Sequence, residues 1–205
     1  MRDRLWNSIR LSSEVLYHPS PIVEALLPKE AGPYGDYLVF PSRLEALKRQ
    51  PLVVEAMRHT KTPVRLVLVG GGPDEPMLRE LIGKYDLQQK VELAGRVPDQ
   101  RLYELYLNAL GVYYGPYDED YGYVTIEGFA ARRPVVTTTD VGGPLEFVTD
   151  HETGLVTPPE PEAIAHAFDV LFSNRPKAQA MGEAGNALIR ERVPGWPEVV
   201  AQLTS

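Results

Sequence analysis

The sequence predicts an α/β protein whose core is a doubly wound parallel β-sheet. Short apolar segments alternate with longer segments of helical spacing from Gly35 onward, as in proteins whose strands are joined by crossover helices. The apolar segments are rich in β-branched or aromatic residues, which is typical of buried strands. With 205 residues, 43% of them hydrophobic, the chain is long enough for one sizeable core.

The first two strands are predicted over residues 37–40 and 64–69. The first segment is entirely apolar and the second is rich in β-branched side chains, so both fit buried strands. A helix is predicted between them over 44–58, where apolar residues recur at helical spacing. After the second strand, Gly70-Gly71-Gly72-Pro73 predicts a tight turn, and Asp74 is expected to cap the helix that follows.

The rest of the chain continues the alternation. Short apolar runs predict further strands at 91–94, 112–114, 134–137 and 154–156. Helical spacing predicts helices at 74–85, 100–110, 121–131, 160–172, 175–191 and 195–203. Because ligands of open parallel sheets bind at the carboxyl ends of the strands, the loops that follow the strands are the candidate site.

Residues 1–33 differ in composition from the residues that follow. They are rich in proline and hold one short strand-like run at 14–17. We therefore predict two parts. Residues 1–33 form an N-terminal strap or linker, the remnant of a preceding domain, and residues 34–205 form one sheet domain with C-terminal helices.

Composition and charge exclude several classes of function. The net charge of −7 argues against a nucleic-acid partner, which would need a basic surface. The chain has no cysteine, so disulfides, thiolate catalysis and zinc–thiolate sites are excluded. The first residues form no signal-like apolar segment, and no stretch has the length and apolar content of a membrane span. We therefore expect a soluble, cytoplasmic protein.

Two glutamates, Glu119 and Glu127, flank the start of the helix predicted at 121–131. The free amides and the dipole of a helix start attract anions, and Gly122 permits close approach of the backbone. At ~1.5 Å per residue, Glu127 lies roughly 7 Å along the helix, and its side chain leans back toward the start. A phosphate bound there would have carboxylates nearby to accept hydrogen bonds from sugar hydroxyls. The alternative is that both glutamates only favour the helix N-terminus electrostatically.

Two cations, Arg43 and Lys48, follow the first predicted strand. Together they can neutralise a diphosphate, Arg43 through its planar fork and Lys48 as a point charge. The alternative is that both are ordinary surface charges. The nearby glycine run is not a Gly-x-Gly-x-x-Gly motif, because Glu75 stands at its last position, so a dinucleotide site is not supported. We expect a tight turn there, with a backbone contact to a ligand at Gly71.

Other chemistry has less support in the sequence. Asp118 and Asp120 are candidate ligands for a divalent metal ion, and Tyr117 is the tyrosine most expected to face a ligand. No nucleophile, base and orienting group stand in a recognisable triad pattern. The four histidines show no ligand spacing; they are His18, His59, His151 and His166.

Several short motifs occur in one order and spacing along the chain. They are Arg43-Leu44-x-x-x-Lys48, Val69-Gly70-Gly71-Gly72-Pro73, Gly95-Arg96-Val97, Glu119-x7-Glu127, Pro134-Val135-Val136, Gly142-Gly143-x-x-Glu146, Gly154-Leu155-Val156 and the late Trp196. Each motif alone is weak, whereas the ordered series is specific. From about Tyr37 to its end, the chain resembles the C-terminal, donor-binding domain of the GT-B retaining glycosyltransferases of family 4 (glycosyl transferases group 1). The resemblance implies a Rossmann-like, nucleotide-sugar-binding domain over 34–205.

The resemblance also implies a role for each site residue. Arg43 and Lys48 bind the donor diphosphate and stabilise the leaving group, and Glu119 holds hydroxyls of the donor sugar; these are the predicted catalytic residues. The predicted donor-binding residues are Glu127 on the ribose, Gly122 with the backbone amides of Tyr123 and Val124 at the helix start, the backbone of Arg96 and Val97 at the base, and Gly71.

The reaction implied is sugar transfer from a nucleotide-diphospho-sugar with retention of anomeric configuration. In front-face attack, the leaving phosphate accepts the proton of the acceptor, and no metal or other cofactor is expected. The chain departs from the family pattern at Ser42 and Asp120, where glycine is usual, and at Tyr121, where phenylalanine is common. An acid at Asp120 is unfavourable beside a diphosphate unless it points to solvent or to sugar hydroxyls, so the donor stays open.

A complete GT-B enzyme also has an N-terminal domain that supplies the acceptor site, whereas only residues 1–33 precede the sheet domain here. We therefore expect that domain to be the missing partner, and the chain alone to bind donor weakly and to transfer little or no sugar. Three alternatives stay open. They are a nucleotide-sugar epimerase of the same architecture, a metal-dependent transferase that uses Asp118 and Asp120, and a non-catalytic binding fragment.

Overall fold

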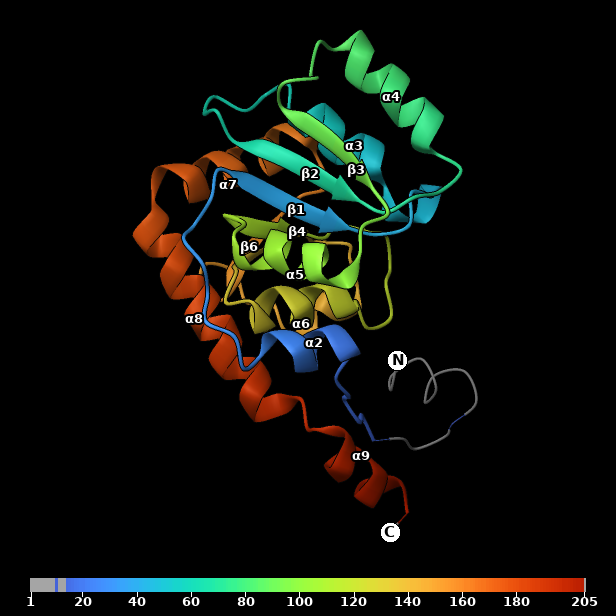
Figure 1. Ribbon diagram of the computed structural model, residues 1–205, viewed down its shortest axis with the longest axis vertical. Helices are drawn as coiled ribbons and strands as arrows, with labels where there is room; N and C mark the ends of the chain where they lie inside the picture. The colour runs from blue at the N-terminus through green and yellow to red at the C-terminus, as the bar shows by residue number, and fades with distance from the viewer. Residues whose placement is uncertain (1–9, 11–13, 205) are drawn as a thin grey trace.

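A computed structural model of the protein describes residue 10 and residues 14–204, which contain a six-stranded sheet between layers of helices (Figure 1). The strands are β1 (Tyr37–Pro41), β2 (Arg65–Val69), β3 (Val91–Gly95), β4 (Gly111–Tyr113), β5 (Val135–Thr138) and β6 (Gly154–Thr157). Neighbouring strands pair in parallel, in the order β3-β2-β1-β4-β5-β6. The chain order reverses between β1 and β4, the position where open parallel sheets bind ligands. The predicted doubly wound fold is confirmed.

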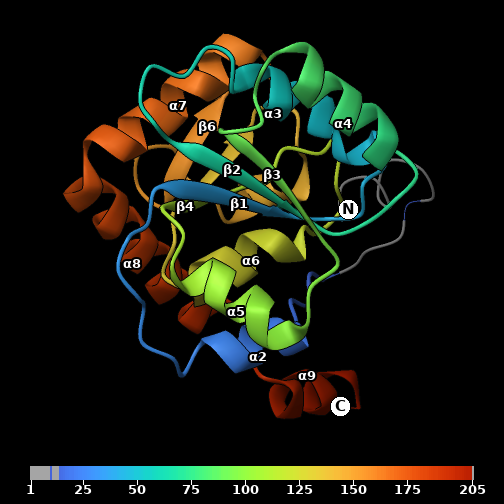
Figure 2. The same cartoon turned by 45° about the horizontal axis from the view of Figure 1, so that its top comes forward.

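Helices cover both faces of the sheet (Figure 2). One layer contains α3 (Gln50–Ala56), α4 (Glu75–Lys84) and α7 (Pro161–Ser173). The other contains α2 (Pro21–Leu26), α5 (Asp99–Leu107) and α6 (Tyr123–Ala130). The long helix α8 (Arg175–Arg192) packs against both α6 and α7, and α9 (Trp196–Leu203) follows it.

The sheet separates two hydrophobic cores, because alternate residues of a strand point to opposite faces. In β1, Leu38 and Phe40 pack into the core on the α3 and α7 side, whereas Val39 packs into the core formed with α5 and α6. All three side chains are fully buried. At about 1.5–3 kcal/mol for each fully buried large apolar side chain, such residues hold the strand ends in place on both sides.

The helix predicted at 44–58 is interrupted. A single 3₁₀ turn, η1 (Ala46–Lys48), comes first, and α3 starts only at Gln50. Arg49 between them has a left-handed backbone with φ of 53°. Pro51 occupies the first turn of α3, where a residue without an N–H is tolerated, whereas inside a longer helix it would remove a hydrogen bond. The prediction of one continuous helix was therefore wrong.

The expected cap at Asp74 is absent. Asp74 precedes α4, but its side chain makes no capping hydrogen bond. Its backbone is already helical, with φ −84° and ψ −2°, whereas a capping side chain normally comes from an extended residue. The helix predicted at 121–131 is confirmed, but α6 starts at Tyr123 because Gly122 has a left-handed backbone with φ of 75°.

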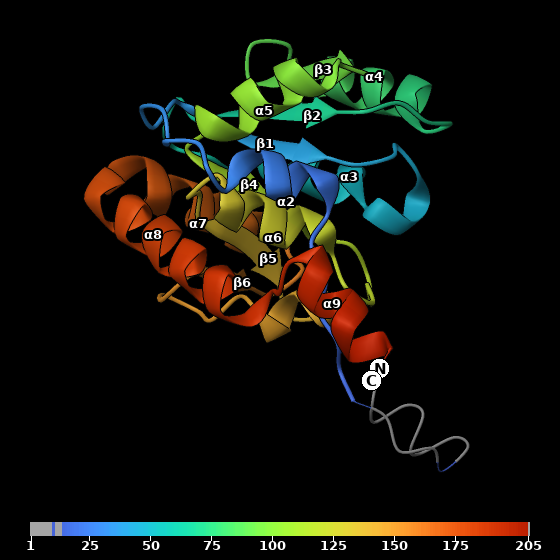
Figure 3. The same ribbon diagram turned by 60° about the horizontal axis from the view of Figure 1, so that its bottom comes forward.

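The N-terminal segment is more ordered than its composition suggests. Residues 14–20 have no regular structure, so the strand-like run at 14–17 does not form a strand. The unpredicted helix α2 follows, and its Val23 and Leu26 are fully buried against α5 and α6 (Figure 3). Ser20 caps this helix, since its side-chain oxygen accepts from the Val23 amide. That residues 1–33 derive from a preceding domain stays a prediction.

Within the described residues, every helix is too short or too polar to span a bilayer.

Candidate functional site

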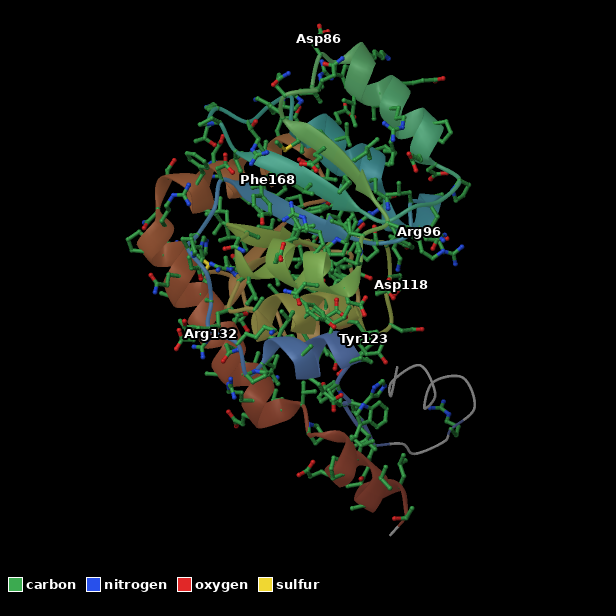
Figure 4. All side chains as sticks on the ribbon, in the orientation of Figure 1. Asp86, Arg96, Asp118, Tyr123, Arg132 and Phe168 are labelled. Atoms are coloured by element: carbon green, nitrogen blue, oxygen red, sulfur yellow. The ribbon has the colours of Figure 1, made fainter. Side chains whose placement is uncertain are left out.

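The loops at the carboxyl ends of the strands meet at one edge of the sheet. The loop after β1 contacts the loop after β2 through Leu44 N–H and Gly71 O at 3.3 Å. The loop after β4 contacts the loop after β5 through two hydrogen bonds of the Glu119 backbone, with Val141 O and Gly143 N, both 2.7 Å. Figure 4 places Arg96, Asp118 and Tyr123 along this edge. These loops carry the residues predicted to bind a ligand.

Lys48 and Glu119 are in direct contact at this edge. The Lys48 ammonium donates to Glu119 Oε2 at 2.5 Å, and the Tyr114 hydroxyl donates to the same oxygen at 2.9 Å. Lys48 also donates to the Tyr114 hydroxyl at 3.3 Å. Burial and the charge of Glu119 raise the pKa of Tyr114, so its hydroxyl remains a donor. Both charged side chains are partly exposed, at 20% and 25%, so a ligand can reach them.

Arg43 is on the same edge but not in this cluster. Its side chain is 77% exposed, and its guanidinium lies 3.5 Å from the carboxylate of Glu45. The structure therefore brings Lys48 and Glu119 together and places Arg43 at the outer side of the loop.

The glycine run after β2 allows two loops to touch. A Cβ added at Gly70 or Gly72 would lie 2.0 Å from the Ser42 carbonyl oxygen or 2.2 Å from the Leu44 carbonyl oxygen. A Cβ at Gly71 would meet only the flexible side chain of Arg96, at 3.3 Å. The requirement for Gly70 and Gly72 thus comes from close packing of the loops. Gly71 and Arg96 lie side by side at the edge, and their contact with a donor stays a prediction.

The start of α6 is shaped by Gly122. A Cβ at this position would lie 2.5 Å from the ring of Pro144, and its backbone is left-handed. The first turn of a helix has amides without intrahelical acceptors, which here include those of Tyr123 and Val124. The Tyr123 hydroxyl lies 3.2 Å from His18 Nδ1. Val97 is partly buried and packs against the core on the α5 and α6 side.

Glu127 is deeper than the sequence suggests. It is 5% exposed, and its carboxylate accepts hydrogen bonds from the Ser20 hydroxyl at 2.9 Å and the Tyr106 hydroxyl at 2.7 Å. Burial raises the pKa of Glu127, and these two hydrogen bonds oppose the effect. The charge of Glu127 also contributes to the raised pKa of Tyr114.

Arg49 was missed in the sequence and links three of the loops. Its guanidinium donates to both carboxylate oxygens of Asp140, at 2.8 and 2.9 Å, and to Thr138 Oγ1 at 3.1 Å. It also donates to the carbonyl oxygens of Gly115, at 2.8 and 3.0 Å, and Pro116, at 3.0 Å. Hydrogen bonds from Arg49 hold the pKa of Asp140 below its usual value. The available signal was an acid, Asp140, three positions after the strand predicted at 134–137.

Ser20 and Tyr106 were also missed. A Ser-Pro pair is a helix-start signal, so Ser20 and Pro21 could have indicated the helix that the proline-rich composition hid. No comparable signal marks Tyr106, which has an apolar helical position and a hydroxyl that only the fold brings to Glu127.

A metal site is not assembled at Asp118 and Asp120. Among residue 10 and residues 14–204, no three His, Cys, Asp or Glu side chains gather in a group that could hold a metal ion. The expectation that no metal or cofactor takes part stays a prediction. Tyr117 is 62% exposed, and its ring lies 5.9 Å from the Arg49 guanidinium.

A separate groove of about 690 Å³ is lined by Tyr34, Arg132 and Arg175, among others. Figure 4 places Arg132 away from the carboxyl edge. Its cations already have partners, because Arg132 lies 2.6 Å from Glu183 and Arg175 donates to the Tyr34 carbonyl oxygen at 2.6 Å.

Comparison with known proteins identifies similar sequences over most of the chain. Residues 29–188 match the family model described as glycosyl transferases group 1. The chain is 28% identical over 209 residues to alpha-1,3/1,6-mannosyltransferase ALG2 of Mus musculus, covering 93% of this chain and 48% of that protein. It is 29% identical over 171 residues to D-inositol 3-phosphate glycosyltransferase of Xylanimonas cellulosilytica, covering 81% and 40%. The chain thus spans less than half the length of these relatives.

Solved structures share the fold. A glycosyltransferase from Rickettsia africae has a TM-score of 0.83 at 20% identity, covering 98% of this chain and 59% of that one. Anabaena Alr3699/HepE in complex with UDP has a TM-score of 0.76 at 21% identity, covering 92% and 53%.

Proposed function

The chain belongs to the glycosyl transferases group 1 family, and on that premise we propose that it is the donor-binding domain of a retaining glycosyltransferase. The donor is a nucleotide-diphospho-sugar. The contact of Lys48 with Glu119 supports the proposal most directly, because it places a cation and a hydroxyl-accepting carboxylate 2.5 Å apart. In the donor, the diphosphate that a cation would bind is likewise next to the sugar whose hydroxyls a carboxylate would bind.

Each part of such a donor has a counterpart at the carboxyl edge. Lys48, together with Arg43 after reorientation, binds the diphosphate, and the amides at the start of α6 add hydrogen-bond donors to the same anion. Glu119 accepts hydrogen bonds from the sugar hydroxyls. Glu127 accepts them from the ribose, and the backbone at Arg96 contacts the base.

The proposed reaction uses the charges at this edge to stabilise the leaving group. The bond between the anomeric carbon and the phosphate oxygen breaks, and the acceptor oxygen bonds to the same face of that carbon. The acceptor proton moves to the leaving phosphate oxygen. Lys48 and Arg43 offset the negative charge that develops on the diphosphate, and this is the type of interaction that lowers the barrier most in preorganised sites.

The acceptor site belongs to a second domain in this proposal, because the chain spans 48% of the mouse relative. Transfer needs both reactants held in line with water excluded. We therefore expect the chain alone to bind donor weakly and to transfer little or no sugar. Alr3699/HepE has been solved with UDP and with UDP-glucose, and such ligands in a protein that contains this fold support the same ligand class here.

Calorimetry with UDP-, GDP- and ADP-sugars tests the proposal. We expect at least one of these nucleotides to bind the folded chain, with the nucleoside diphosphate carrying most of the affinity. Circular dichroism on the same sample confirms folding. A folded chain that binds none of the three would refute the donor-binding function.

A further inference from the structure

Glu127 is held from two sides by residues outside its own helix. The Ser20 hydroxyl donates to Oε1 at 2.9 Å from the N-cap of α2, which is 107 positions away in the sequence. The Tyr106 hydroxyl donates to Oε2 at 2.7 Å from α5. Tyr106 is fully buried and Ser20 is 8% exposed, so neither hydroxyl is free to turn into solvent.

These hydrogen bonds use only part of the capacity of the Glu127 carboxylate to accept hydrogen bonds. An ionised carboxylate offers about four lone-pair sites over its two oxygens. Ser20 occupies one site on Oε1 and Tyr106 one site on Oε2. Each oxygen therefore keeps acceptor capacity for one more donor, and two vicinal hydroxyls would supply one donor to each.

We propose that Ser20 and Tyr106 are positioning residues that fix the carboxylate of Glu127 to accept both ribose hydroxyls of the nucleotide. This inference rests on the proposed function. Ser20 is itself fixed, because its oxygen accepts from the Val23 amide at 3.2 Å while its proton points to Glu127. Ser20 and Tyr106 act through Glu127 and need not touch the ligand.

The carboxylate needs these partners to remain an acceptor. Burial raises the pKa of Glu127, and the hydrogen bonds from Tyr106 and Ser20 lower it. Loss of either donor makes protonation of Glu127 easier and leaves one of its oxygens without a fixed partner, so the carboxylate can rotate. In both cases the paired arrangement of acceptors that matches a vicinal diol is lost.

A purely structural role predicts a different outcome. If the two hydrogen bonds served only to attach α2 and α5 to α6, their loss would lower stability. It would then affect all nucleotides to the same extent, whether or not these carry ribose hydroxyls. The change in affinity on removal of a ribose hydroxyl therefore distinguishes a positioning role from a purely structural one.

The experiment compares a nucleoside diphosphate with its 2′-deoxy form. Calorimetry of the full chain with UDP, GDP and ADP selects the base, and the matching 2′-deoxynucleotide is titrated next. We expect the wild type to favour the ribonucleotide roughly tenfold, as for a hydrogen bond to a charged group. In Tyr106→Phe and Ser20→Ala this ratio falls toward one, while affinity for the deoxynucleotide changes little. Ser20→Thr keeps the hydroxyl and the helix cap and retains the ratio.

Each result supports or overturns the positioning role of Ser20 and Tyr106. Equal losses for both nucleotides in Tyr106→Phe and Ser20→Ala would show a structural role and overturn the inference. If Glu127→Gln removes the preference but both variants keep it, the ribose contact stands and the positioning role is wrong. A folded wild type that binds no nucleoside diphosphate overturns the proposed function together with the inference. If Ser20→Ala does not fold, Tyr106→Phe, which removes only a hydroxyl, provides the test by itself.

Discussion

The ammonium group of Lys48 lies 2.5 Å from the carboxylate of Glu119, 71 positions further along the chain. Their contact joins the loop after β1 to the loop after β4, across the point where the strand order reverses. Tyr114, directly after β4, donates to the same carboxylate oxygen at 2.9 Å. This pairing of charge at the carboxyl edge is thus built by the topology of the sheet.

Lys48→Met should weaken nucleoside diphosphate binding. The substitution keeps an unbranched side chain of similar length and removes the positive charge. Loss of one charge-assisted hydrogen bond corresponds to about 1.5–3 kcal/mol, or roughly a tenfold or greater loss of affinity. Calorimetry measures the change, with Lys84→Met on the exposed surface of α4 as the matched control. Equal affinities of the Lys48 and Lys84 variants would remove Lys48 from the site.

Arg49→Ala should loosen the site and destabilise the domain. The guanidinium holds Asp140, Thr138 and two carbonyl groups of the loop after β4. We expect a loss of about 2–3 kcal/mol in the free energy of unfolding. Arg49→Gly loses the same hydrogen bonds but suits φ of 53°, so it should be about 1 kcal/mol more stable than Arg49→Ala.

Urea unfolding of both Arg49 variants measures these differences. Arg49→Lys provides a third comparison, because lysine keeps the charge but cannot form the planar fork. We expect Arg49→Lys to lower nucleotide affinity about as much as Arg49→Ala does. Wild-type affinity in Arg49→Lys would indicate that charge alone is sufficient at this position.

Gly72→Ala and Gly83→Ala should have opposite effects on stability. A Cβ at Gly72 would lie 2.2 Å from the Leu44 carbonyl oxygen, whereas a Cβ at Gly83 meets nothing within 4 Å. We expect Gly72→Ala to cost about 1–3 kcal/mol through overpacking. Gly83 is inside α4, so Gly83→Ala should gain about 1 kcal/mol from helix propensity. Thermal unfolding tests both, and a tolerated Gly72→Ala would mean that the two loops are not packed as described.

Glu127→Gln should remove a pH dependence of stability. Burial raises the pKa of Glu127 above its usual value of 4.5, so the folded state holds this proton more tightly than the unfolded state does. The resulting stabilisation is fully present below the unfolded pKa and is lost as pH rises through the folded pKa.

The wild type should therefore lose stability relative to Glu127→Gln as pH rises above about 4.5. Urea unfolding of both proteins at matched pH values gives the difference in free energy of unfolding. If the free energy of unfolding of the wild type, minus that of Glu127→Gln, stayed constant or increased with pH, Glu127 would not be destabilised by burial. Glu24→Gln on exposed α2 surface is the control for loss of a carboxylate.

The strands of this fold are predictable from the sequence because each is short and mostly apolar or β-branched. The run at 37–40 became Tyr37–Pro41, and the run at 91–94 became Val91–Gly95. The loops at their carboxyl ends follow from the strand positions. The proximity of Lys48 and Glu119 could therefore be expected, since both follow strands that end at the same edge.

The rest depends on contacts between residues distant in the sequence. Arg49 interrupts a helical pattern with its left-handed backbone, and its guanidinium forms hydrogen bonds with carbonyl groups more than sixty positions away. The hydroxyls of Ser20 and Tyr106 reach Glu127 only after α2 and α5 have packed on α6. Local periodicity carries no information about such partners, so the burial of Glu127 was not foreseen.

A crystal structure of the chain with the tightest-binding nucleoside diphosphate tests whether the nucleotide binds at the carboxyl edge. We predict the diphosphate within hydrogen-bond distance of Lys48 Nζ and of the first amides of α6, with the ribose directed toward Glu127. A nucleotide bound away from the carboxyl edge, for example in the groove beside Arg132 and Arg175, would contradict the account.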